Sequence, residues 1–166
     1  MKTDRPTTKI IAGKYKGKVL ELPSLDVTRS SKSVLKESLF NVLQFDIINK
    51  VFIESFAGSG SIGLEAISRG AKRAYFIELD RNSYQILIRN CKAVDIDKCQ
   101  TVQGNTFVQT PLILEFLKNS KEEIVLYVDP PFAYREGMED IYKKSFNMIS
   151  QIEANNIFMI IVEHVS

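Results

Sequence analysis

The segment Asp129-Pro130-Pro131-Phe132 has the residue types that most directly suggest chemistry. It follows the apolar run IVLYV, and proline cannot donate to a strand ladder, so a strand must end there. An aromatic amino nitrogen is a poor nucleophile because its lone pair is delocalised into the ring. Acceptors for its two N–H groups, which Asp129 and the Pro130 carbonyl could supply, would favour a pyramidal nitrogen and offset the charge that develops on attack. Phe132 offers a face for stacking a base, although the same residues would also serve as a simple strand-ending turn.

A second group of residues, in the stretch ESFAGSGSIG and beyond, is typical of a nucleoside-binding site. Gly58, Gly60 and Gly63 match G-x-G-x-x-G, where the backbone can approach a ligand closely. Glu78, twenty residues after Gly58, could accept hydrogen bonds from both ribose hydroxyls. Glu54 could meet the charged amino-acid moiety of S-adenosylmethionine but would repel a phosphate. NAD and S-adenosylmethionine both fit the glycines and Glu78, and Glu54 favours S-adenosylmethionine.

Asn105 follows a third strand, close to where an adenine would lie, and could bond its amino group or be a plain turn residue. The predicted cofactor site is Glu54, Phe56, Ala57, Gly58, Ser59, Gly60, Glu78, Leu79, Asn105, Thr106 and Asp129. This chemistry requires no metal and no covalent nucleophile. Cys91 and Cys99 are too few and too plainly spaced for a disulfide framework or a zinc site, and we expect a structural role for His164.

The elements that must position these residues alternate along the chain. Strands are predicted at VFIESF, RAYFIEL, QTVQG, IVLYV and NIFMIIVEH. Helices are predicted at SIGLEAISRG, residues 82–94, TPLILEFLKN from Pro111, and residues 138–150. This alternation predicts an α/β fold with a doubly wound, mostly parallel sheet covered by helices on both faces. In such a sheet ligands bind beyond the carboxyl ends of the strands.

The N-terminal part, KIIAGKYKGKVLELP, has a different pattern. Residues 9–12 and 18–22 are two short β-like runs, predicting a hairpin or an open loop pair, and a helix is predicted over residues 33–45. Residues 1–36 contain nine Lys/Arg and three Asp/Glu, a net charge of +6, while the remaining residues carry −4. We therefore expect residues 1–46 to be a basic extension that meets a polyanion, and residues 47–166 to be the catalytic core of the same domain.

Composition is that of an ordinary globular protein. The 166 residues are 45% hydrophobic and 25% charged, which suits one domain with a sizeable core. No apolar segment follows the N-terminal charges, and the longest aliphatic and aromatic run is IFMIIV, far short of a membrane span. We expect a cytoplasmic monomer with free thiols and no membrane contact.

The motif DPPF is similar to the D/N-P-P-F/Y/W motif of amino-methylating nucleic-acid methyltransferases. More closely, the chain resembles the bacterial small-subunit ribosomal RNA guanine-N2 methyltransferases, the RsmD family. The resemblance runs in order through IIAGKYKGKVLELP, RSSKSVLKESLFNVL, ESFAGSGSIGLEAISRGA, FIELDRN and VDPPF. It implies a Rossmann-like fold that transfers a methyl group from S-adenosylmethionine to the exocyclic N2 amine of a guanine in 16S ribosomal RNA, leaving S-adenosylhomocysteine.

The resemblance also implies residue roles. Asp129, Pro130 and Phe132 would hold the target guanine, and the basic N-terminal segment would contact the RNA of the small ribosomal subunit. The predicted RNA-binding residues are Lys14, Tyr15, Lys16, Lys18, Arg29, Lys32, Tyr134 and Arg135.

The sequence departs from the family pattern in three places. The family's Arg-Pro-Thr-Thr segment is Arg29-Ser30-Ser31-Lys32 here, and a usual downstream arginine is Val34. The family continues into two further strands after residue 166, so IFMIIV is expected to be an exposed apolar edge. Three alternatives are a DNA adenine methyltransferase, a non-catalytic RNA-binding module with the same fold, and a nicotinamide-dependent oxidoreductase. Glu54 and the DPPF motif argue against an oxidoreductase, because neither serves hydride transfer.

Overall fold

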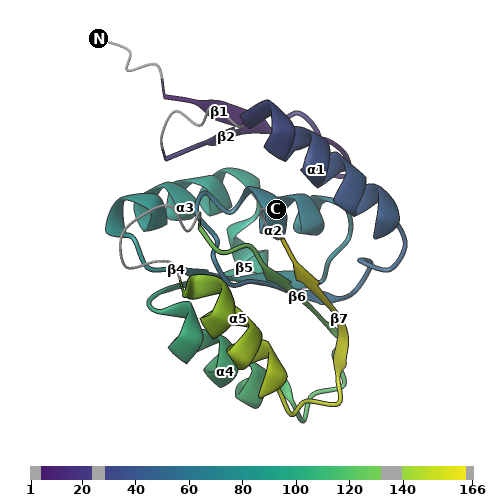
Figure 1. Ribbon diagram of the computed structural model, residues 1–166. Coiled ribbons are helices and arrows are strands. Elements are labelled where there is room, and N and C mark those ends of the chain that lie inside the picture. The colour runs from purple at the N-terminus through teal and green to yellow at the C-terminus, as the bar shows by residue number, and fades with distance from the viewer. Residues whose placement is uncertain (1–4, 24–28, 132–139, 164–166) are drawn as a thin grey trace.

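A five-stranded sheet with all neighbours parallel forms the centre of the computed structural model, which describes residues 5–23, 29–131 and 140–163 (Figure 1). Its strands, in spatial order, are β5 (Cys99–Gln103), β4 (Arg73–Glu78), β3 (Val51–Glu54), β6 (Ile124–Val128) and β7 (Ile157–Val162). The first of these strands in the sequence, β3, is the middle one. The chain therefore builds the sheet outward to one side and then to the other, with a switch point between β3 and β6.

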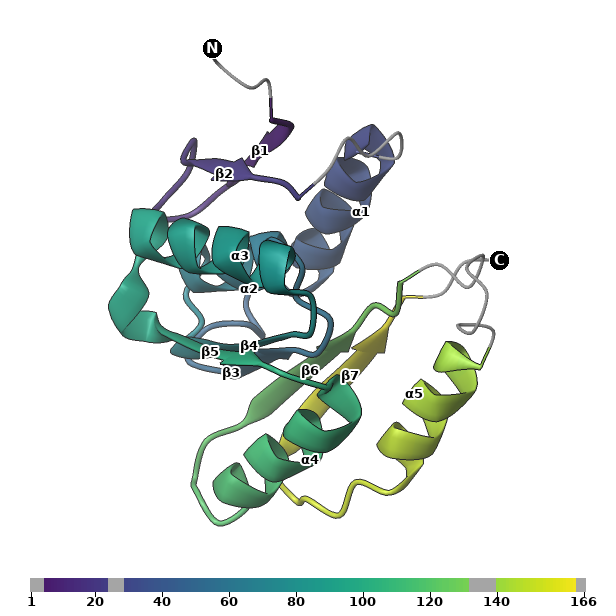
Figure 2. The same ribbon diagram turned by 90° about the vertical axis from the view of Figure 1, so that its left-hand side faces the viewer.

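Helices cover both faces of this sheet, as the alternating pattern predicts (Figure 2). One face carries α1 (Arg29–Val42), α2 (Ser61–Ser68) and α3 (Arg81–Val94), and the other carries α4 (Thr106–Leu117) and α5 (Ile141–Ser150). A short 3₁₀ helix, η1 (Ile96–Lys98), links α3 to β5. The predicted doubly wound α/β fold is confirmed.

The central strands are buried on both faces, which explains their continuous apolar runs. Phe52 of β3 packs into the cluster beneath α1, α2 and α3, whereas Val51 and Ile53 pack into the cluster beneath α4 and α5. Every residue of β3 and β6 is buried. Glu54, the last residue of β3, is 2% exposed, so a carboxylate ends an otherwise apolar strand inside the protein.

The predicted N-terminal hairpin is present. β1 (Thr7–Lys9) and β2 (Val19–Glu21) pair antiparallel, with Thr7 opposite Glu21. Ile10 and Leu20 are 1% and 0% exposed and belong to the core cluster beneath α1, α2 and α3. The basic extension is thus packed on the body of the domain and is not a free arm.

The start of α4 differs from its predicted position at Pro111. The helix begins at Thr106, where the side chain of Asn105 accepts a hydrogen bond from the Phe107 N–H at 2.8 Å, and Pro111 lies inside it. Pro111 removes one helical N–H donor, but the cap and a buried hydroxyl chain support the first turns. In that chain Thr110 contacts Thr106 at 2.8 Å and Ser55 at 3.0 Å.

Other boundaries differ less. α1 begins at Arg29, four residues before the predicted start, and the remaining elements lie within a few residues of their predicted ranges. β7 is an edge strand whose side chains are half-buried except for the exposed Phe158, and among the residues that the structure describes no strand follows it. In these same residues, no helix is both long and apolar enough to cross a membrane.

Candidate cofactor and base-binding site

The carboxyl ends of β3, β4 and β6 bring the predicted chemical residues to one edge of the sheet. In the register of the sheet Glu54 lies beside Phe76 of β4 and Tyr127 of β6. Glu78 ends β4 two residues after Phe76, and Asp129 comes two residues after Tyr127. Three carboxylates from three neighbouring strands therefore share this edge, where doubly wound sheets bind ligands.

The loop between β3 and α2 has a structural need for each of its glycines. Gly58 and Gly60 have positive φ angles of 55° and 82°, which favour glycine. A Cβ on Gly63 would lie 2.3 Å from the Phe76 ring, so the motif also allows α2 to pack closely on β4. A Cβ on Gly58 would meet nothing within 4 Å, so the loop backbone faces open space there. Gly63 thus allows α2 to pack tightly on β4, while the open side of the loop at Gly58 leaves room for a ligand.

Glu54 is a buried carboxylate with one backbone donor. Its Oε1 accepts the Gly63 N–H at 2.9 Å. Burial raises the pKa of Glu54 well above its usual range, and the nearby charges of Asp129 and Glu78 raise it further, while the Gly63 N–H lowers it. A cationic ligand at this edge would lower that pKa again, because it would offset the negative charge of all three groups.

Glu78 holds the glycine loop from the side of β4. One carboxylate oxygen accepts the Gly58 N–H at 2.7 Å, and the other accepts the Asp80 N–H at 2.8 Å. Each oxygen keeps a second lone pair for a further donor. The predicted ribose contact of Glu78 is compatible with this geometry and stays a prediction.

The remaining predicted cofactor residues surround the loop and the start of α4. Ala57 and Ser59 are buried in the loop, and Thr106 is buried in the first turn of α4. Phe56 is half-buried, and its ring meets that of Phe107 edge-on with centroids 5.8 Å apart. Leu79 is 68% exposed next to Glu78. Asn105 is exposed but caps α4, so its amide oxygen has a structural task besides any contact with adenine.

Asp129 and Pro130 leave β6 next to Glu54. Asp129 is half-buried and Pro130 is buried, whereas Pro131 is exposed. The Val128 carbonyl just before them accepts the Glu163 N–H at 2.9 Å, which fixes the end of β6 against β7. The negative charge of Asp129 also raises the pKa of Tyr127 on the same strand, after burial, which is the larger cause. Phe132, Tyr134 and Arg135 lie outside the described residues.

The predicted RNA-binding residues of the N-terminal segment lie between β1 and β2. Lys14, Lys16 and Lys18 are exposed, and the Lys14 ammonium lies 5.4 Å from the centre of the Tyr15 ring. Tyr15 is itself anchored, because its hydroxyl donates to Asp95 at 2.6 Å, and this hydrogen bond raises its pKa to about 12. Arg29 and Lys32 fall in the first turns of α1, where only the backbone is described.

Several buried polar residues around the loop were not predicted from the sequence. Glu65 and Lys36 form an ion pair at 3.5 Å with 0% and 3% of their side chains exposed, and Arg69 lies 2.8 Å from the same carboxylate. Asn90 is 2% exposed and bonds to the loop carbonyl of Ser59 at 2.8 Å. The available signal was a lone glutamate in the otherwise apolar helix SIGLEAIS.

The order of the strands, the glycine loop and the acids at the carboxyl edge define a Rossmann-like methyltransferase fold. The solved structure of Escherichia coli yhhF, which carries a provisional methyltransferase name, matches with a TM-score of 0.65 and 29% identity, covering 93% of this chain and 75% of that chain. Haemophilus influenzae HI0767, provisionally named a methylase, matches with a TM-score of 0.63 and 26% identity, covering 97% and 84%.

A family model described as "Conserved hypothetical protein 95" matches residues 8–166, and the chain belongs to this family, the RsmD family. Ribosomal RNA small subunit methyltransferase D of Haemophilus influenzae is 36% identical over 129 residues, which are 76% of this chain and 64% of that protein. The Escherichia coli protein of the same name is 36% identical over 132 residues, 78% of this chain and 62% of that protein. The chain thus spans slightly less than two thirds of the length of these relatives.

Proposed function

We propose that this protein transfers a methyl group from S-adenosylmethionine to the exocyclic N2 amine of a guanine in small-subunit ribosomal RNA. The observation that carries the proposal is the meeting of Glu54, the glycine loop and Asp129-Pro130 at one edge of the sheet in a chain of the RsmD family. The names of the curated relatives support an RNA substrate.

The residues at the edge fit S-adenosylmethionine, which supplies an electrophilic methyl group when bound. Glu54 would pair with its ammonium group, since a buried carboxylate with a raised pKa gains most from a cation. The open side of the loop at Gly58 would face the ligand, and Glu78 would accept from the ribose hydroxyls. Asn105 and Thr106 would lie beside the adenine.

Asp129 and the Pro130 carbonyl would act on the target amine. Each accepts one N–H of the amino group, which directs the nitrogen lone pair out of the ring plane and stabilises the positive charge that develops as the N–C bond forms. As the N–C bond forms, the bond between the methyl group and the donor sulfur would break to leave S-adenosylhomocysteine, and the methylated amine would lose one proton to solvent. Phe132 would stack on the base, which must first be turned out of its helix.

The exposed cations of the N-terminal segment would hold the RNA backbone. Lys14, Lys16 and Lys18 face solvent on a packed support, and Arg29, Lys32, Tyr134 and Arg135 are the further predicted contacts. If each of the three lysines contacts one phosphate, changing all three to glutamine should reduce the slope of log affinity against log salt by roughly 2 to 3. Deleting the segment would be a poorer test, because Ile10 and Leu20 belong to the core. The small subunit as partner, the cytoplasmic location and the monomeric state stay predictions.

The test is incubation of the protein with S-adenosylmethionine labelled in the methyl group and ribosomal RNA, or small subunits, that lack the modification. We expect label on the N2 atom of one guanine in the wild type and strongly reduced label with Asp129→Ala. Adenine-containing DNA provides the competing substrate. Label on DNA adenine, or binding of RNA without transfer, would overturn the proposal in favour of one of its alternatives.

A further inference from the structure

Asn90 of α3 connects the N-terminal hairpin directly to the cofactor loop. Its Oδ1 accepts the Glu21 N–H of β2 at 2.9 Å, and its Nδ2 donates to the Glu21 carbonyl at 2.9 Å and to the Ser59 carbonyl at 2.8 Å. The side chain is 2% exposed, so these bonds are shielded from water. One buried amide therefore fixes strand β2 relative to the loop that contains Gly58 and Gly60.

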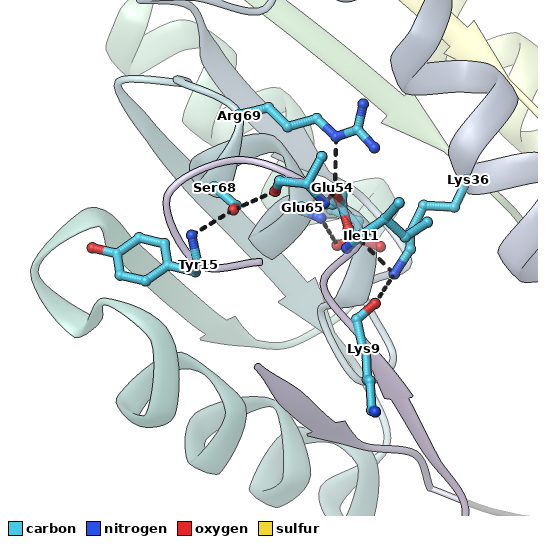
Figure 3. A network of polar contacts seen from close by, with 10 residues as sticks. Lys9, Ile11, Tyr15, Lys36, Glu54, Glu65, Ser68 and Arg69 are labelled. Atoms are coloured by element: carbon cyan, nitrogen blue, oxygen red, sulfur yellow. Dashed lines mark hydrogen bonds and ion pairs between the residues drawn. The ribbon is translucent and has the colours of Figure 1, made fainter. Parts of the chain in front are cut away.

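Glu65 of α2 makes a second connection to the same segment, shown in Figure 3. Its two carboxylate oxygens accept the backbone N–H groups of Ile11 at 2.9 Å and Ala12 at 3.1 Å. Lys36 from α1 pairs with Glu65 at 3.5 Å and donates to the Lys9 carbonyl at 3.2 Å. Burial lowers the pKa of Lys36, and the charge of Glu65 opposes that shift. Helices α1 and α2 thus hold the segment after β1 through buried charges.

Ser68, at the end of α2, fixes the turn that carries the lysines. Its carbonyl accepts the Lys14 N–H at 2.8 Å, and its hydroxyl accepts the Tyr15 N–H at 2.9 Å and donates to the Ala12 carbonyl at 2.6 Å. A Cβ on Gly13 would lie 2.0 Å from the Ser68 carbonyl oxygen, so the backbones touch at this point. Hydrogen bonds therefore hold the segment of residues 9–21 to α2 over residues 11–15 and to α3 at Glu21.

α2 and α3, which hold this segment, also contact the glycine loop between β3 and α2. α2 begins directly after Gly60, and its Gly63 N–H donates to Glu54. Buried side chains thus hold the segment that contains Lys14, Lys16 and Lys18 in a fixed position relative to the glycine loop. An RNA bound to those lysines would be positioned with the same accuracy, because no flexible linker intervenes.

Building on the proposed function, we propose that Asn90 and Glu65 are positioning residues for methyl transfer. They join the segment that contains Lys14, Lys16 and Lys18 to the glycine loop. An RNA backbone held by these lysines would then place the base at Asp129-Pro130 at the distance and orientation that methyl transfer requires. They touch neither substrate nor cofactor themselves.

The test compares Asn90→Asp and Glu65→Gln with a control, Leu117→Ala. Asn90→Asp keeps the size of the side chain and its acceptor for Glu21 but loses both donors. Glu65→Gln keeps one acceptor for the Ile11 or Ala12 N–H and loses the charge. Leu117 is 2% exposed in the cluster on the opposite face, so its truncation destabilises the domain without touching the segment. Melting temperatures establish that variants and control are comparably destabilised and folded at the assay temperature.

Single-turnover transfer at saturating S-adenosylmethionine and RNA gives the decisive readout. We expect a fall of roughly 10- to 100-fold in both positioning variants, which is the usual effect of slight misplacement of reacting groups. The dissociation constant for S-adenosylhomocysteine should change less than about threefold. Leu117→Ala should keep nearly the wild-type rate. Amide hydrogen exchange should become faster at Glu21 in Asn90→Asp and at Ile11 and Ala12 in Glu65→Gln.

Three results would overturn this inference. Positioning variants that transfer methyl at the rate of the control would show that the buried contacts only stabilise the fold. Loss of S-adenosylhomocysteine binding equal to the loss in rate would show that the contacts shape the cofactor loop alone. A wild-type protein that binds S-adenosylhomocysteine but transfers no methyl to RNA would overturn the proposed function first, and this inference with it.

Discussion

The two halves of the carboxyl edge differ in how their polar groups are held. Around β3 and β4, the carboxylates of Glu54 and Glu78 accept the Gly63, Gly58 and Asp80 N–H groups, so acids and loop fix one another. At the end of β6, the half-buried Asp129 and the buried Pro130 follow a buried strand, and the next residue, Pro131, is exposed. In the proposed function, the first half binds S-adenosylmethionine and the second accepts hydrogen bonds from the target amine. Changes in the first half should alter binding, and changes in the second should alter rate.

Asp129→Ala should have the largest effect. Removal of one preorganised polar contact with the reacting group should lower the single-turnover transfer rate about 10²- to 10³-fold, or roughly 2.7 to 4 kcal/mol. The affinity for S-adenosylhomocysteine should be nearly unchanged, because the glycine loop and Glu78 are untouched. Asp129→Asn keeps a carbonyl acceptor and should retain more activity than alanine. A wild-type rate in Asp129→Ala would make DPPF a strand terminator only.

Glu54→Gln should weaken S-adenosylhomocysteine binding by roughly 1.5 to 3 kcal/mol, the usual range for a hydrogen bond to a charged group. The pKa of Glu54 is raised in the free protein and should fall when an ammonium group binds. Binding should therefore release a proton at pH values between the lowered pKa of Glu54 in the complex and its raised pKa in the free protein, and affinity should increase with pH over that range. Calorimetry in buffers of different ionisation enthalpy measures the released proton, which should disappear in Glu54→Gln.

The same carboxyl also predicts the pH dependence of the free protein. Because its pKa is higher when folded than when unfolded, the native state binds more protons at pH values between 4.5, the ordinary pKa, and the raised pKa, and stability should fall as pH rises through this range. Glu54→Gln should flatten this part of the stability profile, measured by urea denaturation. A profile identical to that of the wild type would show that the pKa of Glu54 is the same in the folded and unfolded states.

Gly63→Ala should destabilise the domain by about 1 to 2 kcal/mol. The new methyl group would lie 2.3 Å from the buried Phe76 ring, and this overpacking should exceed the gain in helix propensity. Phe76→Leu in the same protein should recover part of the loss by making room, which denaturant titration can measure. Equal destabilisation with and without Phe76→Leu would contradict the close packing of α2 on β4.

Tyr15→Phe should have the smallest effect, about 1 kcal/mol, because it removes one partly exposed hydrogen bond to Asp95. The pKa of Tyr15 is raised to about 12, so this contribution should be complete below pH 10 and lost as pH rises through 12. Wild type and variant should thus become equally stable near pH 12. Transfer and cofactor binding at neutral pH should stay close to those of the wild type.

The sequence predicted the sheet and the position of its ligand edge because these depend on local patterns. Fully buried strands such as β6 read as continuous apolar runs, and G-x-G-x-x-G stands between β3 and α2. The predicted start of α4 at Pro111 is wrong, because proline is also tolerated inside this helix and the real cap is Asn105, which the sequence indicates only as an adenine contact or a plain turn residue.

The buried polar contacts were missed for a different reason. Asn90 and Glu21 are 69 residues apart, and Glu65 lies 54 residues from Ile11, so neither pair shares a local pattern. A polar residue in a helix is usually exposed, and nothing near Asn90 in the sequence marks it as buried. Such partners become evident only when the layers are assembled.

The long sequence separations within the N-terminal segment have a consequence for synthesis. Residues 9–21 leave the ribosome before their partners Glu65, Ser68 and Asn90, which follow 53 to 69 residues later. Contacts between distant residues form late, because the intervening chain must first be ordered. We therefore expect the hairpin to pack on the domain only after α3 has been synthesised. This segment would thus fold after parts of the domain that are translated later.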